Sequence, residues 1–172
     1  IAEQTTASDQ PQFISSGVIN TKNGEPAIDF DGTNDYLEAQ ANTDLDSGND
    51  FTALTVSNVS VLNGNGRIFA NKDDSTGGVS RYFIGNDSRS NKTISNITNT
   101  TPTNHISEYI TQQNTTNQKL LTGIVKNTEH LAYYNNDLQD TVSWSGSYLN
   151  DIFRVGSGVN NAAPLNGTIQ EI

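Results

Sequence analysis

Cysteine and methionine are both absent from this chain of 172 residues. Without cysteine the chain forms no disulfide bond and offers no thiolate ligand to a metal ion, and nothing points to an oxidising or a reducing compartment. The sequence also has no apolar run close to the roughly 20 residues that a membrane-spanning helix requires. A disulfide-stabilised scaffold, a zinc–thiolate site and a helical membrane protein are therefore excluded.

Basic residues are scarce as well. Nine lysine and arginine residues stand against 19 aspartate and glutamate residues, so the formal net charge is −10 and the pI is near 4.3. Such a chain repels the phosphate backbone of nucleic acids and the surface of anionic membranes. We therefore expect no nucleic-acid partner and no membrane insertion.

The apolar fraction is 33% and the mean hydropathy is −0.56, which is low for a globular domain. The apolar residues nevertheless come in short clusters, and the length suits one domain with a core of its own. We interpret residues 1–172 as a single domain. Because the chain begins with Ile1 and not with methionine, we also interpret it as a fragment of a longer chain.

No stretch of ordinary helical length shows the 3.6-residue apolar period of a helix. Instead, about a dozen short runs alternate between apolar and polar residues, with turn residues between them. In the longest run, residues 51–62, we place Leu54 and Val56 on the core side. A hairpin is expected around Asn135 and Asn136, because asparagine tolerates the positive φ of a tight turn. The pattern predicts an all-β fold: a two-sheet antiparallel β-sandwich.

Three stretches in order resemble the concanavalin A-like lectin/glucanase superfamily, in its laminin-G-like branch. They are GEPAIDFDGTNDYLEA at residues 24–39, LLTGIVKNTEHLAYYNNDLQ at residues 120–139, and NDIFRVGSGVNNAAPLNGTIQEI at residues 150–172. The first is similar to the opening hairpin of the family, the second to its central pair of strands, and the third to a late strand with the return strand. The resemblance implies a jelly roll of two stacked antiparallel sheets.

Acidic residues gather in the first of these stretches. Asp29 and Asp31 alternate with Ile28 and Phe30, so we expect the two carboxylates to face solvent. Asp35 follows a Gly-Thr-Asn turn, where a short carboxylate accepts backbone N–H bonds. Hydrolases of this superfamily that resemble endoglucanases place paired acids on one strand in a Glu-x-Asp-x-x-Glu run, which this chain lacks. We therefore assign no catalytic residue and expect no enzyme activity.

Histidine offers little to catalysis here. His105 and His130 are the two histidines of the chain, and each stands at the start of a strand-like run. We expect both at the surface or at strand ends. No Gly-x-Ser-x-Gly element accompanies them, so a nucleophilic triad is not indicated.

The loop DLDSGND places acids at Asp44, Asp46 and Asp50. Alternating carboxylates with a glycine are typical of oxygen-rich calcium loops, and some laminin-G-like domains hold calcium at the sandwich rim. The spacing differs from that of an EF-hand, and the alternative is a solvated loop. Calcium is thus the one metal that the sequence suggests, and no other cofactor is expected.

Sugar binding needs aromatic faces beside hydrogen-bonding amides. Tyr134, Trp144 and Tyr148 lie in or just after the expected hairpin, among asparagine and serine residues. We name these three as candidate ligand-binding residues. The alternative is core packing, which the shared face of Val142 and Trp144 favours for the tryptophan.

Taken together, these patterns favour a non-catalytic, lectin-like recognition or structural module of a larger extracellular or virion-surface protein, such as a phage fibre. Its expected partner is a cell-surface glycan or another subunit of the assembly. Two alternatives stay open, a polysaccharide hydrolase or lyase of the same fold and a purely structural assembly domain without a ligand.

Overall fold

The computed structural model describes residues 3–40, 50–60, 66–73, 79–87, 92–98, 104–112, 117–144, 152–158 and 163–171. Nearly all regular structure in these residues is β-strand; the exception is one 3₁₀ turn, η1 (Ala7–Asp9). Among the described residues, no helix has the length and apolar character needed to cross a membrane. The predicted all-β class is confirmed.

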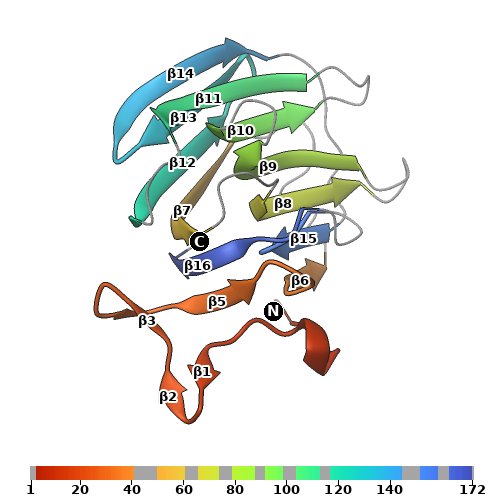
Figure 1. The fold of residues 1–172 in the computed structure, drawn as a ribbon. Helices are drawn as coiled ribbons and strands as arrows, with labels where there is room; N and C mark the ends of the chain where they lie inside the picture. Colours follow the sequence, from red (N-terminus) through yellow and green to blue (C-terminus); the bar gives the residue numbers. More distant parts are fainter. Residues whose placement is uncertain are drawn as a thin grey trace.

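Two antiparallel sheets of six strands form the body of the molecule (Figure 1). The front sheet has the order β11–β10–β9–β8–β15–β6 and consists of β6 (Leu37–Gln40), β8 (Gly66–Asp73), β9 (Val79–Asp87), β10 (Lys92–Thr98), β11 (Asn104–Gln112) and β15 (Ile152–Val155). The back sheet has the order β14–β13–β12–β7–β16–β5 and consists of β5 (Ile28–Asp31), β7 (Phe51–Val59), β12 (Lys119–Val125), β13 (Glu129–Tyr134), β14 (Asp137–Ser143) and β16 (Asn166–Glu171). This is the predicted two-sheet sandwich.

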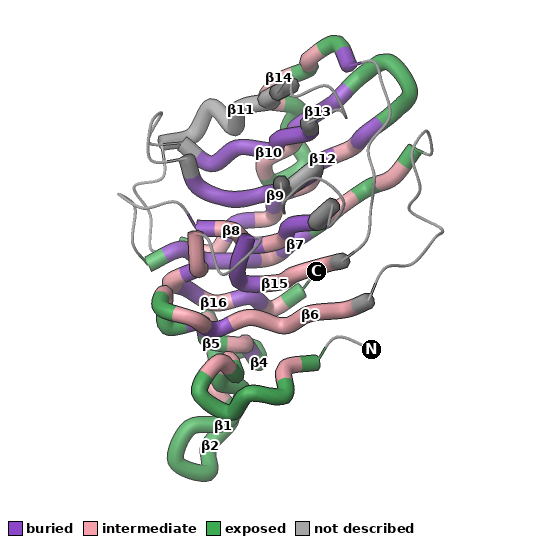
Figure 2. Tube along the Cα trace, turned by 90° about the vertical axis from the view of Figure 1, so that its right-hand side faces the viewer, coloured by how far each residue is buried: buried purple, intermediate pink, exposed green. Residues whose placement is uncertain are grey.

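The sheets approach each other at one edge, where β11 lies against β13 and β14. Two small hairpins precede the sandwich, β1 (Ile14–Ser15) with β2 (Val18–Ile19), and β3 (Thr21–Lys22) with β4 (Glu25–Pro26). They project beyond the two sheets (Figure 1) and are largely exposed, whereas burial concentrates in the central strands (Figure 2).

The main core lies between the sheets, and a second small cluster lies on the outer side of the front sheet. On β9, Tyr82 and Ile84 belong to the main core, whereas Phe83 between them belongs to the second cluster with Ala70 and Ile94. Since successive strand residues point to opposite faces, the second cluster must lie on the outer face. The front sheet is therefore covered on both sides at its centre.

The predicted orientation of β7 is wrong. Leu54, expected in the core, is 40% exposed, whereas Thr55 and Ser57 are buried. Phe51 and Ala53 pack against the main core and fix the face of the strand. The polar side chains of Thr55 and Ser57 share that face because the period of a strand is two residues.

The turn at residues 32–35 also differs from the prediction. The family-like opening hairpin is not a hairpin within one sheet, because β5 pairs with β16 in the back sheet and β6 pairs with β15 in the front sheet. Gly32, at φ +80°, starts the crossing. An added Cβ at this glycine would lie only 2.6 Å from the Cβ of Asn166, so only glycine fits there. The turn therefore links the two layers of the sandwich.

The second expected hairpin is present. Asn135 (φ 49°) and Asn136 (φ 71°) form the two-residue turn between β13 and β14. Both positive φ values match a type I′ turn, the connection that suits the right-handed twist of paired strands. The prediction from the Asn-Asn pair is confirmed.

Candidate functional site

A row of chemically varied side chains crosses the outer face of the front sheet. Glu38 on β6 is paired in register with Arg154 on β15, and Arg154 is paired with Ala70 on β8. Ala70 in turn pairs with Phe83 on β9, and Phe83 pairs with Asn96 on β10. We call these five residues the outer row. The row places a carboxylate, a guanidinium, a small side chain, an aromatic ring and an amide on adjacent strands.

The β6 end of the outer row is held by a charged pair. Arg154 Nε donates to Glu38 Oε2 at 2.7 Å, and Arg154 Nη1 donates to the carbonyl of Gly158 at 3.3 Å. The guanidinium also lies over the ring of Tyr36, with 4.3 Å between the guanidinium carbon and the ring centroid. The side chains of Arg154 and Glu38 are 12% and 25% exposed, so this end of the row reaches solvent.

The central part of the row is covered. Arg67 from β8 stacks on Phe83, with 3.4 Å between its guanidinium carbon and the ring centroid. Its Nη1 also donates to the carbonyl of Asn86 at 3.0 Å. Ala70, Phe83 and Asn96 are all buried, so a ligand on this face would first meet the Arg154 end and the Arg67 guanidinium.

This arrangement suits recognition more than bond cleavage. Guanidinium and amide groups donate hydrogen bonds, carboxylates accept them, and aromatic rings offer apolar faces, which is the mixture that orients a polar ligand. Glycoside hydrolysis instead needs two carboxyl groups about 5–9.5 Å apart. The outer row contains one carboxylate, Glu38.

The acids of the inter-sheet turn have structural partners. Asp35 is 5% exposed, and its Oδ2 accepts the backbone N–H of Asp31 at 2.9 Å. Asp31 Oδ1 accepts the N–H of Thr33 at 2.7 Å. Asp29 and Asp31 are exposed, on the side opposite the buried Phe30. The predicted positions of these three acids are confirmed.

Burial raises the pKa of Asp35 above its ordinary value of 3.8. The backbone hydrogen bond from Asp31 lowers the pKa in part, and the carboxylates of Asp31, Asp29 and Asp9 raise it further. The surroundings of Asp35 therefore destabilise its ionised form relative to its protonated form. Its role is to join the two layers at the turn.

The three predicted aromatic residues do not form one platform in the described structure. Trp144 is 4% exposed and belongs to the main core, which is the packing alternative that the sequence left open. Tyr134, at the end of β13, is half-buried and packs against the same core. Tyr148 lies outside the described residues. A sugar contact at these positions stays a prediction.

The predicted calcium loop lies mostly outside the described residues. Asp44 and Asp46 fall there, and Asp50, directly before β7, is exposed. Within the described residues, no group of three histidine, cysteine, aspartate or glutamate side chains gathers in a way that could hold a metal ion. The calcium site therefore stays a prediction.

A buried polar cluster that the sequence did not indicate lies at the centre of the main core. His130 is the second residue of β13, as expected for a strand start, but it is fully buried and not at the surface. Its Nε2 lies 2.7 Å from Ser95 Oγ, and Ser95 Oγ lies 2.9 Å from Tyr82 Oη. His105 is the second residue of β11, as expected for a strand start. The Ser95–His130 pair is closed off from solvent and serves packing, because the β13 strand turns residue 130 inward.

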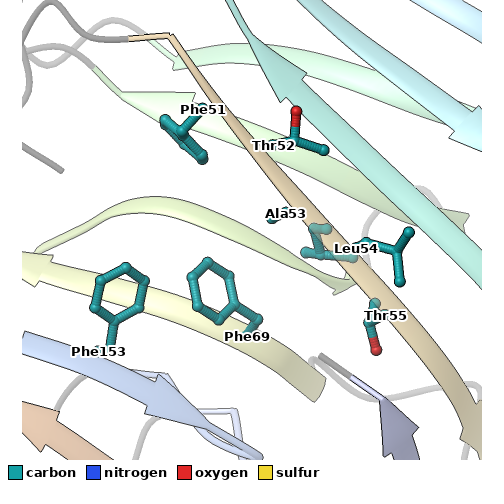
Figure 3. Close-up of a pocket in the computed structure, with 8 residues that line it drawn as sticks. Phe51, Thr52, Ala53, Leu54, Thr55, Phe69 and Phe153 are labelled. Atoms are coloured by element: carbon teal, nitrogen blue, oxygen red, sulfur yellow. The ribbon is translucent and has the colours of Figure 1, made fainter. Parts of the chain in front are cut away.

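A second feature is an apolar cavity between the sheets, of about 190 Å³. It lies beside the first half of β7 and is closed on the front side by Phe69 of β8 and Phe153 of β15, whose rings lie beside each other (Figure 3). The exposed Thr52 and Leu54 stand at its border. The cavity lies on the inner side of the front sheet, away from the outer row.

The sequence matches no protein-family model and no curated protein at a significant level. Solved structures do share its fold. The carbohydrate-binding module CBM40 of the Ruminococcus gnavus IT-sialidase, solved with bound α2,3-sialyllactose, aligns with a TM-score of 0.61 and 11% identity over 84% of this chain and 86% of that chain. Domains LG4–5 of the mouse laminin α1 chain align with a TM-score of 0.57 and 11% identity over 83% of this chain and 38% of that chain.

An alginate lyase of polysaccharide lyase family 7 aligns with a TM-score of 0.51 and 11% identity over 95% of this chain and 80% of that chain. At such identities the alignments establish the architecture alone. The architecture of this chain is therefore the concanavalin A-like jelly roll, similar to laminin-G domains, as the three sequence stretches predicted.

Proposed function

We propose that this chain is a non-catalytic module that binds a carbohydrate chain on the outer face of the front sheet. The observation that carries the proposal is the outer row, with its charged pair at the solvent-reaching end. The fold is shared with a module solved with a bound sugar, which supports the same class of ligand for this chain.

Sugars match the chemistry of this face. Their hydroxyl groups donate and accept hydrogen bonds, and their C–H faces stack on aromatic rings. Arg154 and Glu38 supply a donor and an acceptor side by side. Tyr36 supplies an aromatic ring next to them, and the Arg154 guanidinium covers one face of this ring.

The proposal includes the setting of the module. We infer a larger extracellular or virion-surface protein, with a cell-surface glycan or a neighbouring subunit as the partner. The motive is the strongly acidic, polar composition of a domain with a recognition fold. The sequence of the complete gene product tests this, since a fibre, capsid or secreted-enzyme context would each be visible there. A cytosolic metabolic enzyme as parent protein would contradict it.

The binding test is a glycan array that carries neutral and anionic sugars, followed by titration calorimetry with the best ligand. Arg154→Gln should lower the affinity about ten-fold or more, because a hydrogen bond to a charged group contributes roughly 1.5–3 kcal/mol. Thermal unfolding of the variant checks that the sandwich is intact.

Lys126→Gln is the matched control. It also removes a cation from an ion pair, with Glu129 at 3.7 Å, but both side chains are about half exposed. Lys126 follows the end of β12 and Glu129 begins β13, both in the back sheet. Its affinity should equal that of the unmodified chain. A chain that binds no sugar on the array would refute the proposed function and favour an assembly domain. Sugar binding that survives Arg154→Gln would refute the placement on the outer row.

A further inference from the structure

We propose that the apolar cavity beside β7 is a second binding site, for a small aromatic molecule of one ring. This site is separate from the outer row, since the cavity opens on the inner side of the front sheet. The proposal is therefore independent of sugar binding.

The walls of the cavity are aromatic and aliphatic. Phe51 comes from β7, Phe69 from β8, Ile84 from β9 and Phe153 from β15, so four strands of both sheets contribute. The rings of Phe69 and Phe153 have centroids 4.9 Å apart and are tilted by 38°. In Figure 3 they face the β7 residues across the open space. A flat apolar ligand would lie between these rings and Ala53.

The pairing of β7 explains why space is left here. β12 pairs with β7 along Phe51–Ser57, but β16 pairs with β7 only from Val56 to Val59. The ladder passes a register shift between Ile169 and Glu171, and its last pair is Glu171 with Val56. Within the described residues, the first half of β7 thus has a neighbouring strand on one side alone. The cavity lies beside this half, and Leu54 is 40% exposed there.

The size of the cavity selects the ligand. An engineered cavity of about 150 Å³, lined by leucine, isoleucine and phenylalanine, stays dry and binds benzene. The cavity of this chain, at about 190 Å³ with a similar lining, is large enough for the same ligand. Filling it restores the dispersion contacts that an empty apolar wall lacks.

One polar group accompanies the lining. Thr55 is fully buried and lines the cavity, and its hydroxyl finds no hydrogen-bond partner in the described part of the chain. A buried hydroxyl without a partner is unfavourable, so a ring that carries a hydroxyl group should bind more tightly than a plain ring. Phenol should therefore have a lower Kd than benzene, by about ten-fold.

The test begins with thermal unfolding of the full chain in the presence of benzene and of phenol. Benzene at ten times its Kd should raise Tm by about 3–6 °C, because a ligand that binds only the folded state stabilises it. Ala53→Leu should abolish the shift, since the larger side chain fills the cavity. Thr55→Val should remove the preference for phenol while benzene still binds.

Val18→Ser is the matched control, because Val18 is 68% exposed on the β1–β2 hairpin and is the most exposed large apolar side chain among the described residues. The benzene shift should persist in this variant. If Ala53→Leu does not fold, nuclear Overhauser contacts from benzene to the Ala53 methyl and the Phe69 ring in the unmodified chain decide alone. The cavity site would be overturned by the absence of a Tm shift, by contacts confined to the β1–β2 hairpin, or by a Tm shift that survives in folded Ala53→Leu. Equal Kd values for benzene and phenol would overturn the role of the Thr55 hydroxyl.

Discussion

The two faces of the front sheet hold their polar side chains in opposite ways, on β9 and β10 inside and on β6 and β15 outside. On the inner face, Ser95 Oγ lies within hydrogen-bond distance of Tyr82 Oη and of His130 Nε2, which reaches it from β13 of the back sheet. All three residues are fully buried. On the outer face, Arg154 and Glu38 form a pair that still reaches solvent. Polar groups alone therefore do not mark a binding site. The inner cluster is closed and structural, whereas the outer pair is where a ligand can approach.

The largest loss of stability is expected from a substitution that disrupts packing in the inner cluster of Tyr82, Ser95 and His130. Gly123 on β12 leaves the space that Tyr82 and Ser95 occupy, and an added Cβ would lie 2.6 Å from Ser95 Oγ and still closer to Tyr82 Oη. Gly123→Ala should therefore lower the free energy of unfolding by about 3 kcal/mol or more, measured by urea denaturation.

Gly66→Ala is its control. The nearest atoms to an added Cβ at Gly66 are 3.7 Å away, which is ordinary contact. This variant should lose less than about 1 kcal/mol, as is usual for a substitution without a packing defect. Equal losses in the two variants would mean that the inner cluster is not tightly packed.

A smaller change, this time a gain in stability, is expected from a substitution of Lys119. Its side chain points to the inner side of the back sheet, as that of Leu121 does. Lys119 is 4% exposed, and in the described structure no hydrogen bond or ion pair involves its ammonium group. Lys119→Met should raise the free energy of unfolding at pH 7 by about 1 kcal/mol, because burial disfavours the charged ammonium, which keeps part of its contact with solvent. Lys126→Met, at a half-exposed position, should change it little.

The pH dependence sharpens this prediction. Burial lowers the pKa of Lys119 below its ordinary value of 10.5. Between the lowered pKa and 10.5 the unfolded chain binds more protons than the folded chain, so stability contributed by this group rises with pH. Unfolding curves of the unmodified chain should show this rise, and Lys119→Met should lack it. Parallel curves for both proteins would contradict a buried, unpaired lysine.

The smallest change in stability is expected from substitutions of Asp35, in the turn that leads to the outer row. Asp35→Ala should cost about 1–2 kcal/mol, because it removes the acceptor for the Asp31 N–H. Asp35→Asn keeps an acceptor oxygen and removes the buried charge, so at pH 7 it should be as stable as the unmodified chain or more so.

The pH dependence of the stability that Asp35 contributes follows from its raised pKa. The folded chain holds this proton more firmly than the unfolded chain, so the stabilisation is full below the ordinary value of 3.8 and is lost as pH rises through the raised pKa. The advantage of Asp35→Asn should therefore disappear at acid pH. An Asp35→Asn variant as unstable as Asp35→Ala at pH 7 would show that the charge itself is needed.

Local patterns predicted much of this fold. The Asn135–Asn136 turn and the alternation around Phe30 depend on neighbours in sequence, and both are as expected. The face of β7 was not predictable from its own residues. Leu54 is apolar and Thr55 is polar, yet the strands packed against β7 turn Thr55 inward, since tertiary contacts override the preference of a single strand.

The site was harder to predict, because register joins residues that lie far apart in sequence. Glu38 and Arg154 are separated by 116 positions and meet only because β6 and β15 pair. One signal was available: an arginine inside the apolar run Ile-Phe-Arg-Val indicates an outward-facing position. The inner pair of Ser95 and His130 gave no such signal, since a buried histidine and a surface histidine look alike in one sequence.

The most direct test of the central claim is a map of amide chemical-shift changes when the tightest array sugar is added to the ¹⁵N-labelled chain. We expect the largest changes on the outer side of the front sheet, at residues 36–38 and 154–158 and around Arg67. Changes confined to the β13–β14 hairpin near Tyr134, or to the outer side of the back sheet, would contradict it.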